Sequence, residues 1–221
     1  MGIRKSIRNW KQYGKLSDLG EISRRKFFNN CFDGALTCAG IISGIFISFL
    51  NPASTIQFTP QFILITGFAT TLAIGISGLW GAFLSEEAER KKKVSDMKKD
   101  MVIIEDKIEI EEEEENNEEK NHKVHKTLLE KAERFATIVA SLVDGGAPAV
   151  GSTLPLIPFF FGGPLSITHF IFSYVILAAL LVYLGIFLGN ISGGGKIRYA
   201  LHLVTAGVVT LLVTLLLGQI T

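Results

Sequence analysis

The chain has 221 residues, of which 48% are hydrophobic and 19% are charged, and its formal net charge is +1. Long charge-free runs alternate with stretches that hold almost every charge, which excludes an ordinary soluble globule. The pattern predicts an all-α, polytopic membrane protein with one polar insertion. No removable signal peptide is expected, because no stretch has the charged, apolar and small-residue order of one.

Residues 1–26 form a basic segment, in which Ile3, Ile7 and Trp10 fall on one helical face with Lys and Arg around them. This pattern suits a helix that lies on an anionic membrane surface. A partly ordered basic tail explains it equally well. The segment has no pattern that indicates a nucleic-acid partner, so membrane lipid is the expected contact.

Five apolar runs are long enough to cross a bilayer of about 30 Å. They are expected at about 27–50, 61–85, 136–161, 166–189 and 197–219. With this layout all 22 Lys and Arg residues face one compartment. The positive-inside rule then places the N-terminus in the cytosol and the C-terminus outside, in a multi-pass protein of the cell membrane. The expected regions are the basic segment 1–26, helices one and two in 27–85, a cytoplasmic insertion in 86–135, and helices three to five in 136–221.

The first four spans resemble a duplicated hairpin. Asp33-Gly34 near the start of span one matches Asp144-Gly145 near the start of span three. The two copies would run in the same direction, because the cytoplasmic insertion restores the orientation. Such repeats are common in transporters, where the site lies at the interface of the repeats.

The insertion changes composition abruptly. Its apolar residues recur at coiled-coil-like spacing in two stretches, which predicts a helical hairpin whose arms continue spans two and three. The acidic run 109–119 would form the tip, although a block of like charges is usually solvated and disordered. Met97 and Met101 lie on the apolar seam, so packing is favoured over metal binding for both.

An acidic residue lies near the start of each of spans one and three. Asp33 shares a helical face with Thr37, and Asp144 shares one with Pro148. A carboxylate inside a bilayer costs roughly 2.5 kcal/mol or more, so such residues are usually functional. Because Pro148 cannot donate to the Asp144 carbonyl, that oxygen and the carboxylate are candidate cation ligands. Alternatively, both acids cap their helices or pair with basic neighbours, for which the candidates are Arg24, Lys131 and Arg134.

Four glutamates form two i,i+3 pairs where the insertion meets the membrane: Glu86 with Glu89, and Glu130 with Glu133. Each pair shares one helix face. If the two arms are neighbours, four carboxylates converge just below the membrane, as in helix bundles that hold iron or manganese. Ordinary surface charge, paired with nearby Lys and Arg, explains the same spacing.

The remaining motifs do not indicate catalysis. Cys31 and Cys38 would have Cα atoms about 10 Å apart on one helix, which is too far for a disulfide. His122 and His125 could bind metal only weakly, beside the acidic run. No nucleophile–base set, phosphate-binding glycine loop or zinc-type spacing is visible, so neither an enzyme nor a resident cofactor is expected.

Three motifs within about 26–221 resemble the vacuolar iron transporter family. They are Phe32-Asp33-Gly34, the small-residue run 73–85 that leads into glutamates, and the Pro-rich stretch 151–161. The resemblance implies a homodimer that exports ferrous iron, manganese or both from the cytosol in exchange for protons. It also implies that Asp33 lines the ion path. The residues that would collect the metal are then Glu86, Glu89, Glu130 and Glu133.

One departure concerns the substrate. Family members typically carry a methionine in span two, close to the position of Gly78, whereas no methionine of this chain falls in a predicted span. The missing soft ligand weakens the expectation of selectivity for ferrous iron, as in a divergent prokaryotic relative. A second hypothesis, from another class, is a membrane anchor or metal-sensing scaffold that does not transport and acts through its acidic hairpin.

Overall fold

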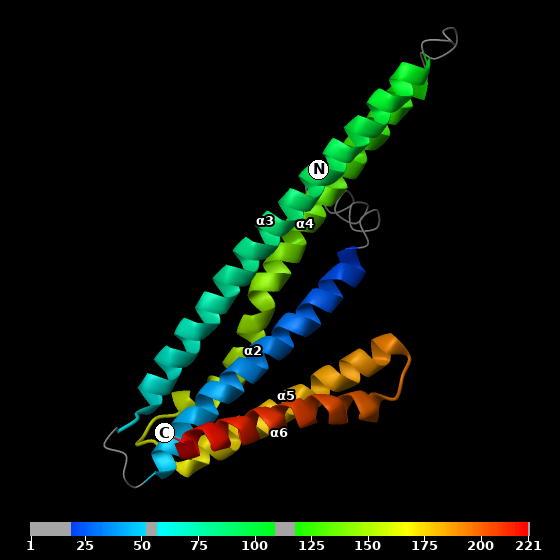
Figure 1. Cartoon of the computed structure of the whole chain (residues 1–221). Helices are drawn as coiled ribbons and strands as arrows, with labels where there is room; N and C mark the ends of the chain where they lie inside the picture. Colours follow the sequence, from blue (N-terminus) through cyan, green and yellow to red (C-terminus); the bar gives the residue numbers. More distant parts are fainter. Residues whose placement is uncertain (1–18, 52–56, 109–117, 221) are drawn as a thin grey trace, which may run out of the picture. The chain divides into compact units, whose positions relative to one another are not determined.

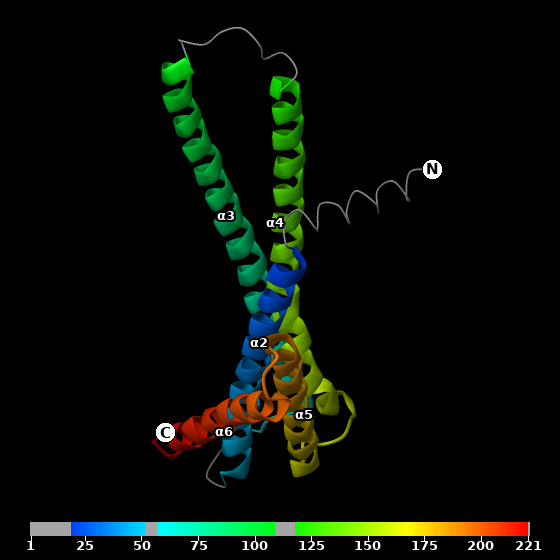
Figure 2. The same cartoon turned by 90° about the vertical axis from the view of Figure 1, so that its right-hand side faces the viewer.

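The computed structural model describes residues 19–51, 57–108 and 118–220, and every regular element in these ranges is helical (Figures 1 and 2). The elements are α2 (Leu19–Leu50), α3 (Pro60–Ile108), α4 (Glu118–Leu156), the short 3₁₀ helix η1 (Ile157–Phe160), α5 (Ile167–Ser192) and α6 (Lys196–Ile220). The all-α prediction is therefore confirmed.

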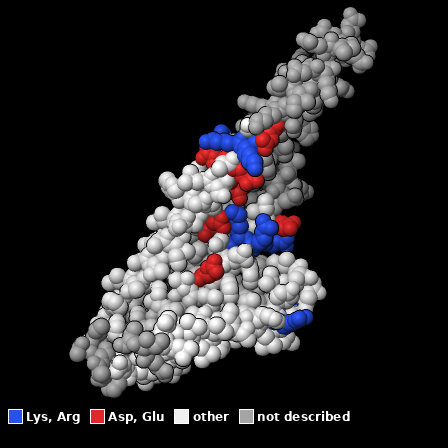
Figure 3. Space-filling model, in the orientation of Figure 1, with Lys and Arg blue, Asp and Glu red and all other residues white. Residues whose placement is uncertain are grey.

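Five of these helices are long and apolar enough to cross a membrane, as predicted. The candidate spans are Leu19–Leu50, Pro60–Glu89, Arg134–Phe160, Ile167–Ser192 and Lys196–Gly218. Apolar side chains cover their outer surfaces: Ile65, Leu72 and Ile76 follow one face of α3 and are 69%, 62% and 64% exposed. Figure 3 shows wide areas of one molecular face without any Lys, Arg, Asp or Glu. Such surfaces suit contact with lipid, and the chain is a multi-pass membrane protein.

Two of the helices extend well beyond a bilayer's thickness. The α3 helix continues to Ile108, and α4 begins at Glu118, so both arms expected for the insertion are helical up to the undescribed residues 109–117. The acidic run falls largely on those residues and lies outside the described part of the chain. The side chains of Met97, Met101, His122 and His125 are likewise outside it.

The chain divides into two compact units. The first contains Gly78–Val143, with the two antiparallel arms of α3 and α4. The second contains Arg25–Ser77 and Asp144–Thr221, and so includes most of α2, the first part of α3, the last part of α4, and all of α5 and α6. The region boundaries expected from the sequence stay a prediction.

Two apolar clusters form the core of the second unit. One is centred on Cys31, Ala35 and Leu181, and the other on Ile42, Leu156 and Phe170. Both cysteines of the chain are free thiols that are buried in these clusters. This agrees with the prediction that they are too far apart to form a disulfide. Small residues pack against one another in the first cluster, so neighbouring helix backbones approach closely there.

Local sequence explains where α4 and α5 end. Pro155 lies in the last turn of α4, which passes into η1 and then into extended backbone at Phe161. Because proline removes a helical hydrogen bond, the α-helix gives way to a tighter turn there. Gly193 ends α5 with φ of 65°, a left-handed conformation that glycine adopts without strain. The turn after Gly193 lets α6 return alongside α5 (Figures 1 and 2).

Candidate functional site

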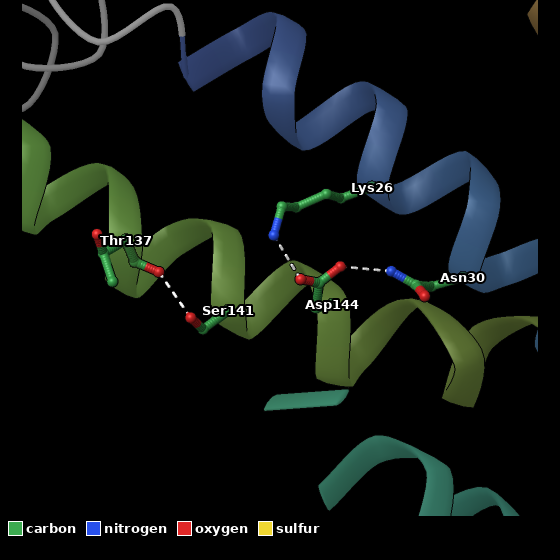
Figure 4. Close-up of polar contacts among 5 residues, drawn as sticks. All are labelled: Lys26, Asn30, Thr137, Ser141 and Asp144. Atoms are coloured by element: carbon green, nitrogen blue, oxygen red, sulfur yellow. Dashed lines mark hydrogen bonds and ion pairs between the residues drawn. The ribbon is translucent and has the colours of Figure 1, made fainter. Parts of the chain in front are cut away.

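Asp144 is the centre of a polar cluster within the second unit (Figure 4). Lys26 Nζ lies 2.6 Å from Asp144 Oδ2, and the side-chain amide of Asn30 donates to Oδ1. Only 20% of the Lys26 side chain and 14% of the Asp144 side chain are exposed. The carboxylate is therefore held by one charged and one neutral donor from α2, largely out of solvent.

Glycines bring α2 and α4 close enough for this contact. A side chain at Gly34 would collide with the backbone of Pro148, and one at Gly151 would collide with the carbonyl oxygen of Cys31. The two helices therefore cross backbone against backbone, immediately beyond Asp144 along α4. Small residues at a crossing permit this approach in membrane proteins.

A second close contact packs another side of α4 against α3. A Cβ at Gly75 would lie 2.8 Å from the carbonyl oxygen of Gly145. Further along, the hydroxyl groups of Thr71 and Ser152 are 2.7 Å apart and share a buried hydrogen bond. The segment of α4 that carries Asp144 is thus fixed between α2 and α3.

The prolines of α4 alter the hydrogen bonding around this segment. Pro148 has no N–H, so the Asp144 carbonyl lacks the donor that an ordinary helix supplies four residues later. Ser152 Oγ donates to the Pro148 carbonyl, and Ser173 Oγ of α5 donates to the Pro155 carbonyl. The role of Asp144 and Pro148 in an ion path stays a prediction.

Asp33 lies on the same face of α2 as the donors to Asp144. Lys26, Asn30, Asp33 and Thr37 follow one another at i, i+4, i+7 and i+11, which places them in one stripe along the helix. Asp33 is exposed and Thr37 is half-buried. Two glycines continue the stripe, and no described atom lies within 4 Å of a Cβ built at either Gly40 or Gly44. At Asp33, Gly40 and Gly44 the stripe therefore forms an open face of α2, whereas the start of the stripe contacts α4.

The structure describes the expected glutamate cluster only in part. Glu86 is half-buried and Glu89 is exposed on α3, while Glu130 and Glu133 lie on α4 with side chains outside the described part. Among the described residues, no group of three or more His, Cys, Asp and Glu side chains is placed to hold a metal. The convergence of these four carboxylates stays a prediction.

Two residues near the expected sites escape sequence reasoning. Sequence spacing suggests Arg24, Lys131 or Arg134 as the basic partner of Asp144, whereas the partner in the structure is Lys26. No local sequence signal indicates this partner, because Lys26 and Asp144 lie on different helices and are 118 positions apart. In the first unit, Glu87 lines a cavity of about 230 Å³ and pairs with Lys91 at 2.9 Å. The other residues that line this cavity are Phe83, Arg134, Thr137 and Ile138.

Comparisons with known proteins give a family match and a distant relative. The model of the VIT family matches residues 115–219, which include Asp144 and the third, fourth and fifth spans. An uncharacterized protein of the archaeon Methanocaldococcus jannaschii is 25% identical over 173 residues, which cover 78% of this chain and 76% of that protein. The resemblance to the VIT family that the sequence suggests is therefore confirmed over residues 115–219, and both matches are consistent with a divergent prokaryotic relative of that family.

Proposed function

We propose that this protein is a proton-coupled secondary transporter that exports a divalent metal ion, Fe²⁺ or Mn²⁺ or both, from the cytosol. The observation that carries the proposal is the VIT family match over the helices that contain Asp144, because that family suggests transport of metal ions across a membrane. A carboxylate in a span helix, fixed between two neighbouring helices, supports the proposal because such residues commonly mark ion pathways in membrane proteins.

In the proposed mechanism the metal ion moves from carboxylates at the cytosolic edge of the membrane to carboxylates within the spans. Glutamates at the cytosolic edge, the pairs Glu86/Glu89 and Glu130/Glu133, gather the ion from solution. Asp144 and Asp33 then bind it in turn and exchange it for protons. Thr37 contributes a hydroxyl group, and Pro148 leaves the main-chain carbonyl of Asp144 without its usual helical donor.

The open face of α2 supports assembly as a homodimer. Asp33 is exposed there, and the positions of Gly40 and Gly44 admit close approach by another helix backbone. A second copy of the chain that covers this face would enclose Asp33 between protomers and give the ion a path shielded from lipid. Dimerisation through α2 is thus part of the proposal.

Flux through reconstituted protein tests the function. Purified protein in liposomes with an imposed pH gradient is expected to move Mn²⁺ or Fe²⁺, and Asp33→Asn is expected to lower the rate by about tenfold or more, a barrier change of about 1.4 kcal/mol. Asp96→Asn, at an exposed position of the α3 arm, is the matched control and should transport normally. If liposomes that contain the Asp33→Asn variant move metal as fast as those that contain the wild-type protein, the assigned role of Asp33 is contradicted.

The same assay separates transport from the scaffold hypothesis. Removal of residues 111–119 is expected to leave most of the flux, because that run lies beyond the proposed path. A protein that carries no divalent ion under any gradient, yet loses a metal-dependent partner interaction on this deletion, would favour the scaffold instead.

A further inference from the structure

Asp144 already has a cation beside it. The ammonium group of Lys26 lies 2.6 Å from Asp144 Oδ2, and both side chains are largely buried. A buried carboxylate without a compensating charge is strongly unfavourable, so the lysine stabilises the ionised acid when no metal is present. The ammonium group therefore stands where an incoming cation would have to bind.

The atoms around this position are suited to a hard cation. Asp144 supplies a carboxylate, and its main-chain carbonyl lacks the usual helical donor because Pro148 follows four residues later. Asn30 now donates from its amide nitrogen, but a half-turn of the amide group would present an oxygen instead. Carboxylate, carbonyl and amide oxygens are ligands that Mn²⁺, Mg²⁺ and Ca²⁺ accept, whereas softer ions prefer sulfur or imidazole.

We propose that Lys26 is a tethered counter-ion at an oxygen-lined cation position formed by Asp144 and Asn30, and that a hard divalent cation must displace its ammonium group to enter. The inference rests on the proposed function, to which it adds a step and a preference for Mn²⁺-like ions. With one carboxylate the position binds weakly, as a transport site must if the ion is to leave again.

The position of Lys26 on α2 explains how displacement of its ammonium group would help the ion to move on. Lys26 and Asn30 begin the stripe that continues through Asp33 and Thr37, so Asp144 stands at one end of the open face. A lysine that holds Asp144 closes this end while the site lacks metal. When a cation takes the carboxylate, the lysine is released and the next ligand along the stripe is Asp33.

Chemical modification of Lys26 in the full-length wild-type protein tests the displacement directly. A water-soluble amine-acylating reagent is applied in detergent micelles, with and without Mn²⁺, and the modified lysines are quantified by mass spectrometry. If Lys26 is bound to Asp144 in about nine of ten metal-free molecules, saturating Mn²⁺ raises its modification by up to about tenfold. Lys196, which is exposed at the start of α6, is the internal control and should not respond.

Two outcomes would overturn the inference. One is a Lys26 modification rate that Mn²⁺ leaves unchanged. The other is an equal increase with sodium chloride at the same ionic strength, which would indicate simple screening of the ion pair. Cd²⁺, a softer ion, is expected to release Lys26 less effectively than Mn²⁺ at equal concentration.

Transport kinetics give a second, independent readout. Lys26→Gln removes the competitor and is expected to lower the half-saturating Mn²⁺ concentration by up to about tenfold. Lys26→Arg keeps the positive charge and should stay closer to wild type. In the Asp144→Asn background, Lys26→Gln should have no further effect on half-saturation, whereas a purely structural lysine would change stability or maximal rate instead.

The two proposals fail in different ways. Wild-type liposomes that carry no metal would refute the proposed function, while the modification experiment would still decide whether a divalent cation displaces Lys26. Conversely, normal flux with unchanged Lys26 modification, and with the same half-saturation in Lys26→Gln, would refute the counter-ion role alone.

Discussion

Gly146 and Gly151 lie on the same helix, α4, but a side chain added at each would meet different surroundings. Gly151 stands against the carbonyl oxygen of Cys31 and the backbone nitrogen of Ala35, whereas no described atom lies near Gly146. At the residue scale, close contact between α4 and α2 therefore depends on Gly151, which faces the α2 backbone, and not on Gly146. The same contact sets the distance between α2 and α4 on which the Lys26–Asp144 pair depends.

A matched pair of alanine substitutions tests this difference. Gly151→Ala should force α2 and α4 apart and destabilise the protein by about 1–3 kcal/mol, as overpacked sites do. Gly146→Ala is expected to be neutral or stabilising by up to about 1 kcal/mol, because alanine favours the helix. Thermal unfolding in detergent measures both. Equal melting temperatures for the two variants would show that the helices do not touch at Gly151.

At the scale of one element, the beginning of α5 is organised by His169. The Ser166 N–H donates to His169 Nδ1 at 3.3 Å, and His169 Nε2 lies 3.0 Å from the Phe161 carbonyl oxygen. Because an N–H must donate and a carbonyl must accept, the proton of the ring is on Nε2. One imidazole thus joins the end of η1 to the first turn of α5.

Removal of this imidazole should loosen the connection. His169→Ala loses the hydrogen bonds of the ring to the N–H and hydroxyl groups of Ser166 and to the Phe161 carbonyl, and it is expected to cost about 1–3 kcal/mol of stability. His202→Ala is the control, because that exposed ring bonds only to a carbonyl of its own helix among the described contacts, and a change within about 0.5 kcal/mol is expected. Unfolding midpoints of the two variants give the comparison, and equal midpoints would assign no stabilising role to His169.

At the scale of the whole molecule, the distribution of charge predicts the orientation in the membrane. All 22 Lys and Arg residues lie outside the connector between spans one and two and the connector between spans three and four. The positive-inside rule therefore predicts that these two connectors lie on the external side. In the proposed mechanism, the orientation determines the compartment from which the Asp144 cluster would receive an ion.

Cysteine labelling of intact cells tests this orientation. Both native cysteines are buried, so the unchanged chain should react little with a membrane-impermeant maleimide. Gly162→Cys, in the connector after η1, should be labelled from outside, whereas Gly195→Cys, between α5 and α6, should be labelled only after permeabilisation. A new side chain at Gly162 meets no described atom, and one at Gly195 makes ordinary contact with Arg198. The reverse labelling pattern would invert the proposed direction of transport.

The sequence by itself determined the class of the protein, the number of spans and the continuation of α3 and α4 beyond the bilayer. These follow from local quantities, namely the length of apolar runs, the spacing of seams and the positions of charges, which do not depend on how helices pack. It also singled out Asp33 and Asp144, because acids are rare in such runs.

Only the tertiary structure decided what these acids contact. The pairing of Asp144 with Lys26 and Asn30 joins residues more than a hundred positions apart, and no local pattern encodes such a distance. The structure also separates two acids that occupy matching places in the sequence repeat, since Asp144 is held by α2 while Asp33 is exposed. The physical reason is the close crossing at Gly34 and Gly151, which turns one carboxylate towards a neighbouring helix and leaves the other on the open face of α2.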